Sequence, residues 1–269
     1  MPETHINLKE QISRSNSALL KKLPRFVVRG LEILIKQDEI NRILNKYSDI
    51  EGVEFLQKVV EELNVRIEYE GLENLPESGK CFFVANHPFG FVDGLILTYT
   101  VGTKYGTLKA IGNELFMLIP QLRPLIAAVN VFGANPKEYL RGLDIVFHSD
   151  SPITHFPAGL VSRLQKGKIV DIDWQKSFIS KSVSCQRDIV PFHFIGRNSF
   201  LFYSVYLIRK TLRIKANIEL ALFPHEIFNK RNKTIKVIIG KPIPYSTFDK
   251  SKSPFEWAQY VKGLVYALK

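Results

Sequence analysis

The stretch from Asn86 to Asp93 contains a histidine and an aspartate separated by five residues, among them a proline and a glycine. It follows the apolar run from Cys81 to Ala85, whose pattern is typical of a short buried strand. If a helix begins near Asp93, its carboxylate can fold back onto the His87 imidazole. An imidazole held by a carboxylate can act as a general base, so this stretch predicts a reaction that removes a proton from a substrate.

The same stretch also fits a histidine with a purely structural role in a Pro/Gly turn. The other five histidines lie in a polar tail, at the end of a predicted helix, or in or beside apolar runs, where a histidine is commonly a core residue. No pair has the His-Glu-x-x-His spacing of a zinc site, and the two cysteines, Cys81 and Cys185, are far apart. We therefore expect no metal site and two free thiols in a reducing compartment.

In two later segments of the sequence, an apolar run is likewise followed by a glycine-containing loop. In the first, His155 and Phe156 lead into Pro157-Ala158-Gly159, followed by Ser162 and Arg163. Backbone N–H groups of such a loop can hold an oxyanion or a phosphate, and the arginine can add a fixed charge. Taken alone, this block also fits a plain turn. The second block runs from Val190 to Ser199 and contains Gly196 and Arg197.

The elements that must position these residues alternate between strands and helices. The predicted strands are Val65–Tyr69, Cys81–Ala85, Thr107–Ile111, Ala127–Phe132, Ile153–Phe156, Ile189–Ile195 and Thr234–Ile239. A helix is predicted before the first strand, at Glu51–Leu63, and helices are predicted between several of the strands, at Leu95–Thr100, Pro136–Ser149 and Trp174–Ser184. This order predicts an α/β fold with a mostly parallel central sheet flanked by helices. Sites on such sheets lie at the carboxyl ends of the strands, where the His87 turn is expected.

The N-terminal region has a helical pattern of its own over residues 15–64, with Pro24 at a helix start or a kink. Its apolar side chains recur at helical spacing, and Lys21, Lys22, Arg25 and Arg29 add positive charge. This pattern fits a helix lying in a lipid interface, and it equally fits an ordinary amphipathic helix on the core. We expect residues 1–64 to form this helical region and residues 65–269 to form the main domain.

The overall charge favours an anionic partner. The chain of 269 residues has 37 Lys and Arg against 26 Asp and Glu, a net charge of +11. No helix-turn-helix, zinc-finger or RNA-binding signature accompanies it, so a membrane surface or an acidic carrier protein is expected rather than nucleic acid. The first residues are polar, and no run reaches the ~18 apolar residues that a membrane span needs. We expect a cytoplasmic protein, peripheral on the inner face of the cell membrane.

Other enzyme classes lack their signatures here. No Gly-x-Ser-x-Gly elbow is present, which disfavours an α/β-hydrolase. Neither a Walker phosphate loop nor a Gly-x-Gly-x-x-Gly fingerprint occurs, so no nucleotide cofactor is expected.

In combination and order, the three blocks resemble the glycerolipid and lysophospholipid acyltransferase family over roughly residues 65 to 245. That family has Asn-His, four residues and Asp, then Phe-Pro-Glu-Gly-Thr-Arg-Ser, then an apolar strand with a proline. The matching positions are Asn86-His87 with Asp93, Phe156-Pro157-Ala158-Gly159 with Ser162, and Val190-Pro191. Three fuller motifs, His-Pro-Phe-Gly-x-x-Asp-Gly at residues 87–94, Phe-Pro-Ala-Gly-x-Val-Ser-Arg at 156–163 and Gly-Arg-Asn-Ser at 196–199, are similar to those of one bacterial branch. This branch is often labelled "putative hemolysin" and is similar to the O-acyltransferases that complete ornithine and glycine lipids.

Four departures from the family pattern bear on the acceptor. His87 and Asp93 have five residues between them instead of four, and Ala158 and Val161 replace the usual Glu and Arg. The arginine of the second motif has no clear match near residues 129–133. Since those charges are associated in the family with binding the acceptor's phosphate, their absence favours an amino-acid lipid acceptor over lysophosphatidate, although Arg163 or Arg197 could take over the role.

The resemblance implies transfer of a fatty acyl chain from an acyl thioester, on acyl carrier protein or coenzyme A, to the hydroxyl of a single-chain lipid, with no further cofactor. His87 is the implied base, and Asp93 would orient it. The implied substrate-binding residues are Asn86, Phe156, Pro157, Gly159, Ser162, Arg163 and Arg197. Candidates for an apolar acyl groove are Phe89, Phe91, Phe116 and Met117. Lysophosphatidate acyl transfer and a non-catalytic membrane-binding protein of the same fold remain the alternatives.

Overall fold

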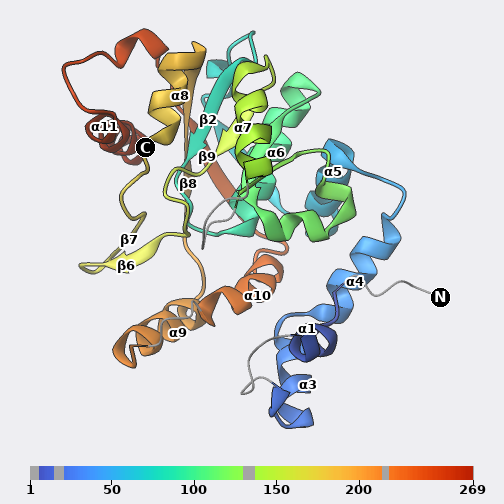
Figure 1. Cartoon of the computed structure of the whole chain (residues 1–269). Coiled ribbons are helices and arrows are strands. Elements are labelled where there is room, and N and C mark those ends of the chain that lie inside the picture. The colour runs from blue at the N-terminus through green and yellow to red at the C-terminus, as the bar shows by residue number, and fades with distance from the viewer. Residues whose placement is uncertain (1–5, 15–20, 130–136, 214–217, 269) are drawn as a thin grey trace. The chain divides into compact units, whose positions relative to one another are not determined.

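The computed structural model describes residues 6–14, 21–129, 137–213 and 218–268, and its elements are drawn in Figure 1. The chain divides into two compact units. The larger comprises Glu51–Arg197 and Asn232–Lys269, and the smaller comprises Met1–Ile50 and Asn198–Arg231. The sequence placed a boundary at residue 64, whereas in this division the helix α5 (Gly52–Glu62) belongs with the sheet.

The larger unit is built on a seven-stranded sheet of order β1-β9-β8-β2-β5-β3-β4. Its strands are β1 (Arg66–Glu70), β2 (Cys81–Ala85), β3 (Lys109–Asn113), β4 (Ile126–Val129), β5 (Ile153–His155), β8 (Asp188–Ile195) and β9 (Thr234–Ile239). Every neighbouring pair is parallel except β8 with β9. The predicted mostly parallel sheet is confirmed. A separate hairpin pairs β6 (Arg163–Gln165) with β7 (Lys168–Val170).

Helices cover both faces of the sheet because the central strand is apolar on both sides. All five residues of β2 are buried. Phe82 and Val84 pack into a core cluster with Phe178 of α8 (Ser177–Cys185) and Trp257 of α11 (Pro254–Ala267). On the other face, the Phe83 ring lies 5.5 Å from that of Tyr105 in α6 (Phe91–Tyr105). Alternate side chains of one buried strand thus anchor two helical layers.

The predicted strand positions agree closely with the structure. The bounds of β2 and β9 are those predicted, and the ends of the other strands match or move by one or two residues, except that residues 130–132 of the predicted Ala127–Phe132 strand lie outside the described residues. The helix α7 (Lys137–His148) also lies where it was predicted. Register places Val84 opposite His155 and Ala85 opposite Phe192, so the carboxyl ends of β2, β5 and β8 meet at one edge.

The smaller unit is helical. It contains α1 (Leu8–Arg14), α3 (Arg25–Leu34) and α4 (Gln37–Lys46), followed much later in the chain by α9 (Phe200–Thr211) and α10 (Phe223–Phe228). Pro24 is the N-cap of α3, so this proline marks a helix start. Ser199 caps α9, and both its N–H and its hydroxyl donate to the buried carboxylate of Glu226. Among the residues that the structure describes, no helix is long and apolar enough to span a bilayer.

Candidate active site

His87 lies on the tight turn between β2 and α6, with its ring beside a buried carboxylate. The turn closes through Gly90, which has φ 85° and forms the N-cap of α6. This conformation suits glycine because other residues rarely adopt a positive φ. Asp93 occupies the first turn of α6, and its Oδ1 lies 3.0 Å from Nδ1 of His87. The folding back of the aspartate that the sequence suggested is present.

The main chain holds the Asp93 carboxylate in place. Its Oδ2 accepts from the backbone N–H groups of Phe89, at 2.8 Å, and Gly90, at 3.3 Å. Its Oδ1 accepts from the N–H of Gly94 at 2.9 Å. The side chain has no solvent exposure, and the helix N-terminus contributes a favourable field. These donors stabilise a negative charge at the position where it can orient an imidazole.

Phe156 fixes the orientation of the His87 ring from one face. The two rings stack with centroids 4.1 Å apart and an interplanar angle of 26°. The side chain of His87 is 17% exposed, so the ring can be reached from outside. With Nδ1 turned to Asp93, Nε2 is the nitrogen that can take a proton from a bound molecule. The geometry is that of a positioned general base.

A second buried carboxylate, Asp171, supports the His87 loop, and it belongs to none of the motifs identified in the sequence. Its Oδ1 accepts from the backbone N–H of His87, at 3.2 Å, and from the hydroxyl of Ser162, at 2.6 Å. Its Oδ2 accepts from the indole N–H of Trp174 at 2.9 Å. Burial raises the pKa of Asp171, while the hydrogen bonds from Ser162 and Trp174 act in the opposite direction. In the sequence, Asp171 could have been noticed only as an acidic residue directly after a short apolar run and three positions before Trp174.

Asn86 joins two strands through a reciprocal amide contact. Its Nδ2 donates to the carbonyl of Phe194 at 2.9 Å, and its Oδ1 accepts from the N–H of Phe194 at 2.7 Å. This pair ties the end of β2 to β8. The side chain is buried, so its observed contacts are those of a structural link beside the base.

The other predicted binding residues lie on the two loops that follow β5 and β8. The N–H of Gly159 donates within its own turn to the carbonyl of Phe156 at 2.9 Å, and Pro157 accepts from the N–H of Gln175 at 2.9 Å. Arg163 is buried, and its Nη1 donates to the carbonyl of Val161 at 2.8 Å. Arg197 is exposed on the loop after β8. The contacts at the His87 turn thus involve Phe156 and Ser162, while the hydrogen bond of the Gly159 N–H stays within its own turn.

His155 is a neighbouring histidine with a different role. Burial, and secondarily the positive charge of His87, lower its pKa to about 4. Its Nδ1 is buried and has no hydrogen-bond partner among the residues described. A histidine of this kind is neutral near pH 7, so it places no competing positive charge beside His87.

The four residues predicted to line an acyl groove do not share one environment. Phe89 is buried, and its ring fills the space that a side chain at Gly196 would need. The rings of Phe91 and Phe116 lie 6.0 Å apart, and both are half-buried, as is Met117. An apolar face for an acyl chain therefore stays a prediction for Phe91, Phe116 and Met117, while Phe89 has the contacts of a core residue.

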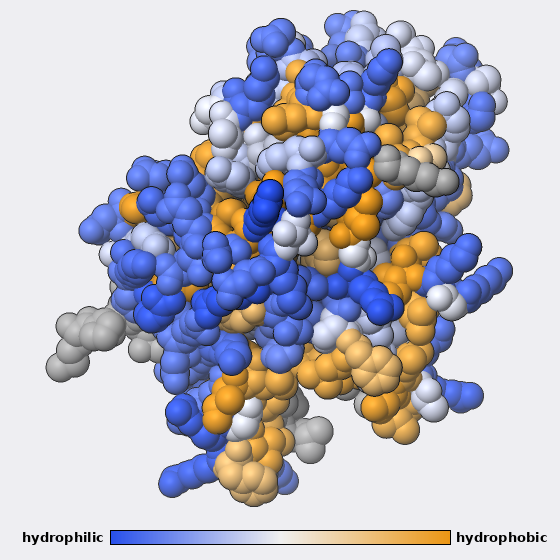
Figure 2. Space-filling view, turned by 180° about the vertical axis from the view of Figure 1, so that it is seen from behind, coloured by the Kyte–Doolittle hydropathy of each residue, from blue (hydrophilic) through white to orange (hydrophobic). Residues whose placement is uncertain are grey.

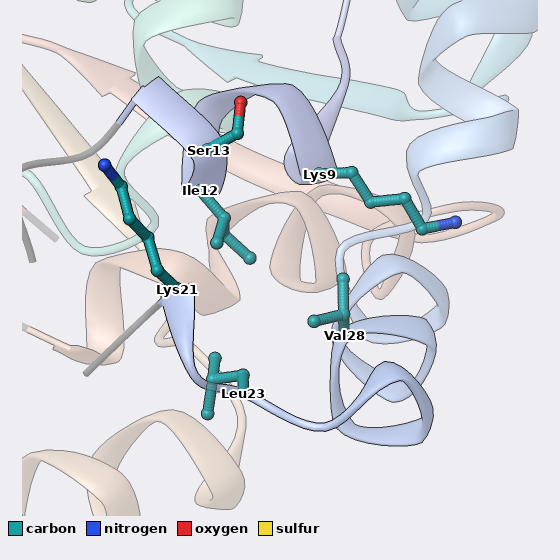
Figure 3. Close-up of a pocket in the computed structure, with 6 residues that line it drawn as sticks. All are labelled: Lys9, Ile12, Ser13, Lys21, Leu23 and Val28. Carbon is teal, nitrogen blue, oxygen red and sulfur yellow. The ribbon is translucent and has the colours of Figure 1, made fainter. Parts of the chain in front are cut away.

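A groove of about 330 Å³ lies in the smaller unit, away from all of these residues in the chain. Figure 3 shows Ile12, Leu23 and Val28 facing it, with Lys9 and Lys21 at its sides. It contains no acid–base pair, which leaves the His87 turn as the stronger candidate. Over the described ranges, no three acidic, histidine or cysteine residues are grouped as a metal site would need.

Comparison with known proteins gives one family. A family model described as "Acyltransferase" matches residues 11–269. Two proteins named "Lyso-glycine lipid O-acyltransferase" align over 249 residues, 92% of this chain. That of Phocaeicola vulgatus is 45% identical with 89% of its length covered, and that of Bacteroides thetaiotaomicron is 46% identical with 92% covered. A crystal structure of a 1-acyl-sn-glycerophosphate (LPA) acyltransferase from Thermotoga maritima aligns over 97% of this chain and 88% of that one. Its identity to this chain is 17% and the TM-score is 0.44.

Proposed function

The chain belongs to the acyltransferase family, and on that premise we propose that it transfers a fatty acyl chain from an acyl thioester to the hydroxyl of a single-chain glycine lipid. That it is a lipid acyltransferase follows from the family and from relatives at 45% and 46% identity. The observation that carries the chemistry is the contact of His87 Nδ1 with the buried Asp93 carboxylate at 3.0 Å.

The proposed reaction is a single displacement at the thioester carbonyl. The lipid hydroxyl oxygen bonds to the carbonyl carbon while its proton moves to Nε2 of His87. The Asp93 carboxylate stabilises the imidazolium that forms. The tetrahedral intermediate then expels the thiolate, which takes the proton from His87. Ester and free thiol are the products, and no covalent enzyme intermediate is needed because the thioester is already activated.

Two observations support the glycine-lipid acceptor: the names of the relatives, and the absence of two charged residues that the wider family has in its third motif. Both relatives carry a lyso-glycine lipid name. In this chain Ala158 and Val161 stand where the wider family has the charges associated with phosphate binding. A lyso-ornithine lipid is the nearest alternative acceptor, and lysophosphatidate is the next, since Arg163 or Arg197 could bind its phosphate.

The donor and the location are part of the same proposal. The net charge of +11 favours an acidic acyl carrier protein as donor, and acyl coenzyme A is the alternative. The acceptor lipid resides in a membrane, so we place the enzyme at the inner face of the cell membrane, as a peripheral protein.

The test is acyl transfer from a radiolabelled thioester, on carrier protein or coenzyme A, to lyso-glycine lipid, lyso-ornithine lipid and lysophosphatidate. We expect two-chain glycine lipid from the wild type. His87→Ala should lower the rate on the order of 100- to 10,000-fold. Asp93→Asn should lower it too, since the amide cannot stabilise an imidazolium.

His148→Ala is the matched control, because His148 is an exposed histidine of α7 that also contacts an aspartate, Asp144. Its activity should equal that of the wild type. Preference for lysophosphatidate would refute the acceptor. Absence of product with every donor and acceptor, from folded protein, would instead favour a non-catalytic membrane-binding protein.

A further inference from the structure

Helix α9 is apolar on two faces, and only one of them is covered. Its buried side chains are Phe202, Tyr203 and Tyr206. The large apolar side chains exposed on this segment are Phe200, Leu201, Leu207, Ile208 and Leu212. At about 100° per residue, the exposed set spans an arc of about 140° that does not overlap the buried set. A helix apolar on all sides is ordinarily buried, so a partner for the second face is missing.

The C-terminal end of α9 carries positive charge. Lys210 and Arg213 are exposed there, whereas Arg209 is largely buried and pairs with the buried Glu219 at 2.8 Å. The whole smaller unit has 15 Lys and Arg against 8 Asp and Glu, a difference of +7 out of the chain's +11. The surplus of positive charge is therefore concentrated in the unit that contains the uncovered helix face.

A second helix of the same unit has the same character. In α3, Phe26 is 78% exposed and Ile33, one heptad later, is 60% exposed. Arg25 and Arg29 are exposed in the same helix. Figure 2 shows apolar surface at the bottom of the view over both α3 and α9. The sequence predicted a helical pattern over residues 15–64, either in a lipid interface or on the core; residues 15–20 lie outside the described residues, and the exposure of Phe26 fits a lipid interface better than a core.

We propose that the outer face of α9, formed by Phe200, Leu201, Leu207, Ile208 and Leu212, docks on the surface of an anionic lipid bilayer. Apolar side chains entering the acyl boundary, with lysine and arginine at the headgroup level, are the pattern of interfacial helices. An anionic surface is favoured over a second copy of this chain, because two copies would bring two units of charge +7 together. The proposal takes from the function only that the substrates are lipids, and vesicle binding is measured without acyl transfer.

The direct test places a fluorescent reporter on the face. Phe200→Trp and Ile208→Trp are compared with wild type in vesicles of phosphatidylglycerol and phosphatidylcholine whose acyl chains are brominated. The native tryptophans, Trp174 and Trp257, are buried and give a constant background. We expect a blue shift and strong quenching at both new positions. Ile145→Trp is the matched control, because Ile145 is 73% exposed on α7 of the larger unit, and its emission should stay unchanged.

A loss-of-function variant tests the same face. Leu207→Ser/Ile208→Ser/Leu212→Ser should lower the affinity for these vesicles at least tenfold without changing the circular dichroism spectrum, while Ile145→Ser should not. Replacing phosphatidylglycerol by phosphatidylcholine should weaken wild-type binding. Equal binding of the triple variant, or no quenching at residues 200 and 208, overturns the proposal. So does a wild-type dimer that the triple variant converts to monomer, because the occupant would then be a second copy.

Discussion

Ser162 is linked to the His87 backbone by one direct hydrogen bond and by a second path through the Asp171 carboxylate. The backbone N–H of Ser162 donates to the carbonyl of His87 at 2.8 Å. Its hydroxyl donates to Oδ1 of Asp171, the same atom that accepts from the backbone N–H of His87. Ser162, on the loop after β5, and Asp171, directly after β7, thereby hold both polar groups of the His87 backbone. The family resemblance implied that Ser162 binds substrate, and that role stays a prediction; in the structure its buried hydroxyl holds the loop that carries the base.

Removing this hydroxyl should loosen the loop. Ser162→Ala leaves the buried Asp171 carboxylate with one donor fewer, and we expect a loss of about 1–3 kcal/mol in the free energy of unfolding. The turnover number should fall more than the Michaelis constant rises, because the base is displaced while the acceptor site is retained. Urea denaturation and steady-state kinetics check this. Ser180→Ala, at an exposed serine of α8, should change neither quantity. If Ser162→Ala has the stability and turnover of the wild type, the Ser162 hydroxyl does not hold the His87 loop in place.

The sheet could be predicted from the sequence because its strands are short apolar runs bounded by turn residues. Cys81–Ala85 and Thr234–Ile239 are of this kind, and their bounds match the structure. The contact of His87 with Asp93 could be anticipated as well, because a strand, a Pro/Gly turn and a helix start leave little freedom between them. Structure that depends on neighbouring residues in the chain can thus be predicted from the sequence.

Contacts between distant elements could not be read in this way. Asp171 reaches His87 across 84 positions of the chain, and Asn86 reaches Phe194 across 108. Neither pairing has a local pattern. Helix α9 was missed for another reason: aromatic and apolar residues occur on both of its faces, so the one-sided periodicity of an amphipathic helix is absent. The grouping of α9 with the N-terminal helices depends on tertiary contacts alone.

His155 should make the protein sensitive to mild acid. Its pKa is lowered to about 4 in the folded state, against about 6.5 in an unfolded chain. The unfolded state therefore binds more protons between these values, and stability is lost as pH falls from about 6.5 towards 4. A difference of roughly 2.5 pKa units corresponds to about 3 kcal/mol.

The comparison that isolates this effect is wild type against His155→Gln, unfolded by urea from pH 7 to pH 4. The difference in the free energy of unfolding between the two proteins should shift by about 3 kcal/mol in favour of the variant as the pH falls. A difference that stays constant over this range would show that the folded protein accommodates a protonated His155.

Arg187 should be essential for the stability of the segment that follows α7. Its side chain is completely buried, and it donates to the carbonyls of Val146, Phe147, Ser149 and Ser151. Arg187→Lys cannot satisfy all of these acceptors, and we expect a loss of at least about 3 kcal/mol in the free energy of unfolding. Arg66→Lys, at an exposed arginine of β1, should cost less than about 0.5 kcal/mol by the same urea titration. A small effect at Arg187 would mean that water replaces its hydrogen bonds.

Gly196 should influence the base through Phe89. A Cβ at position 196 would lie 2.4 Å from Cζ of Phe89, at a backbone φ of 144° that favours glycine. Since the N–H of Phe89 donates to the Asp93 carboxylate, a ring forced aside should disturb the aspartate that orients His87. We expect Gly196→Ala to lower turnover at least tenfold. Adding Phe89→Leu should restore part of the activity by relieving the clash. Gly142→Ala, on α7 with open space around its Cβ, should leave activity unchanged. If the double variant is no more active than Gly196→Ala, the backbone conformation of Gly196 accounts for the loss, and the contact with the Phe89 ring does not.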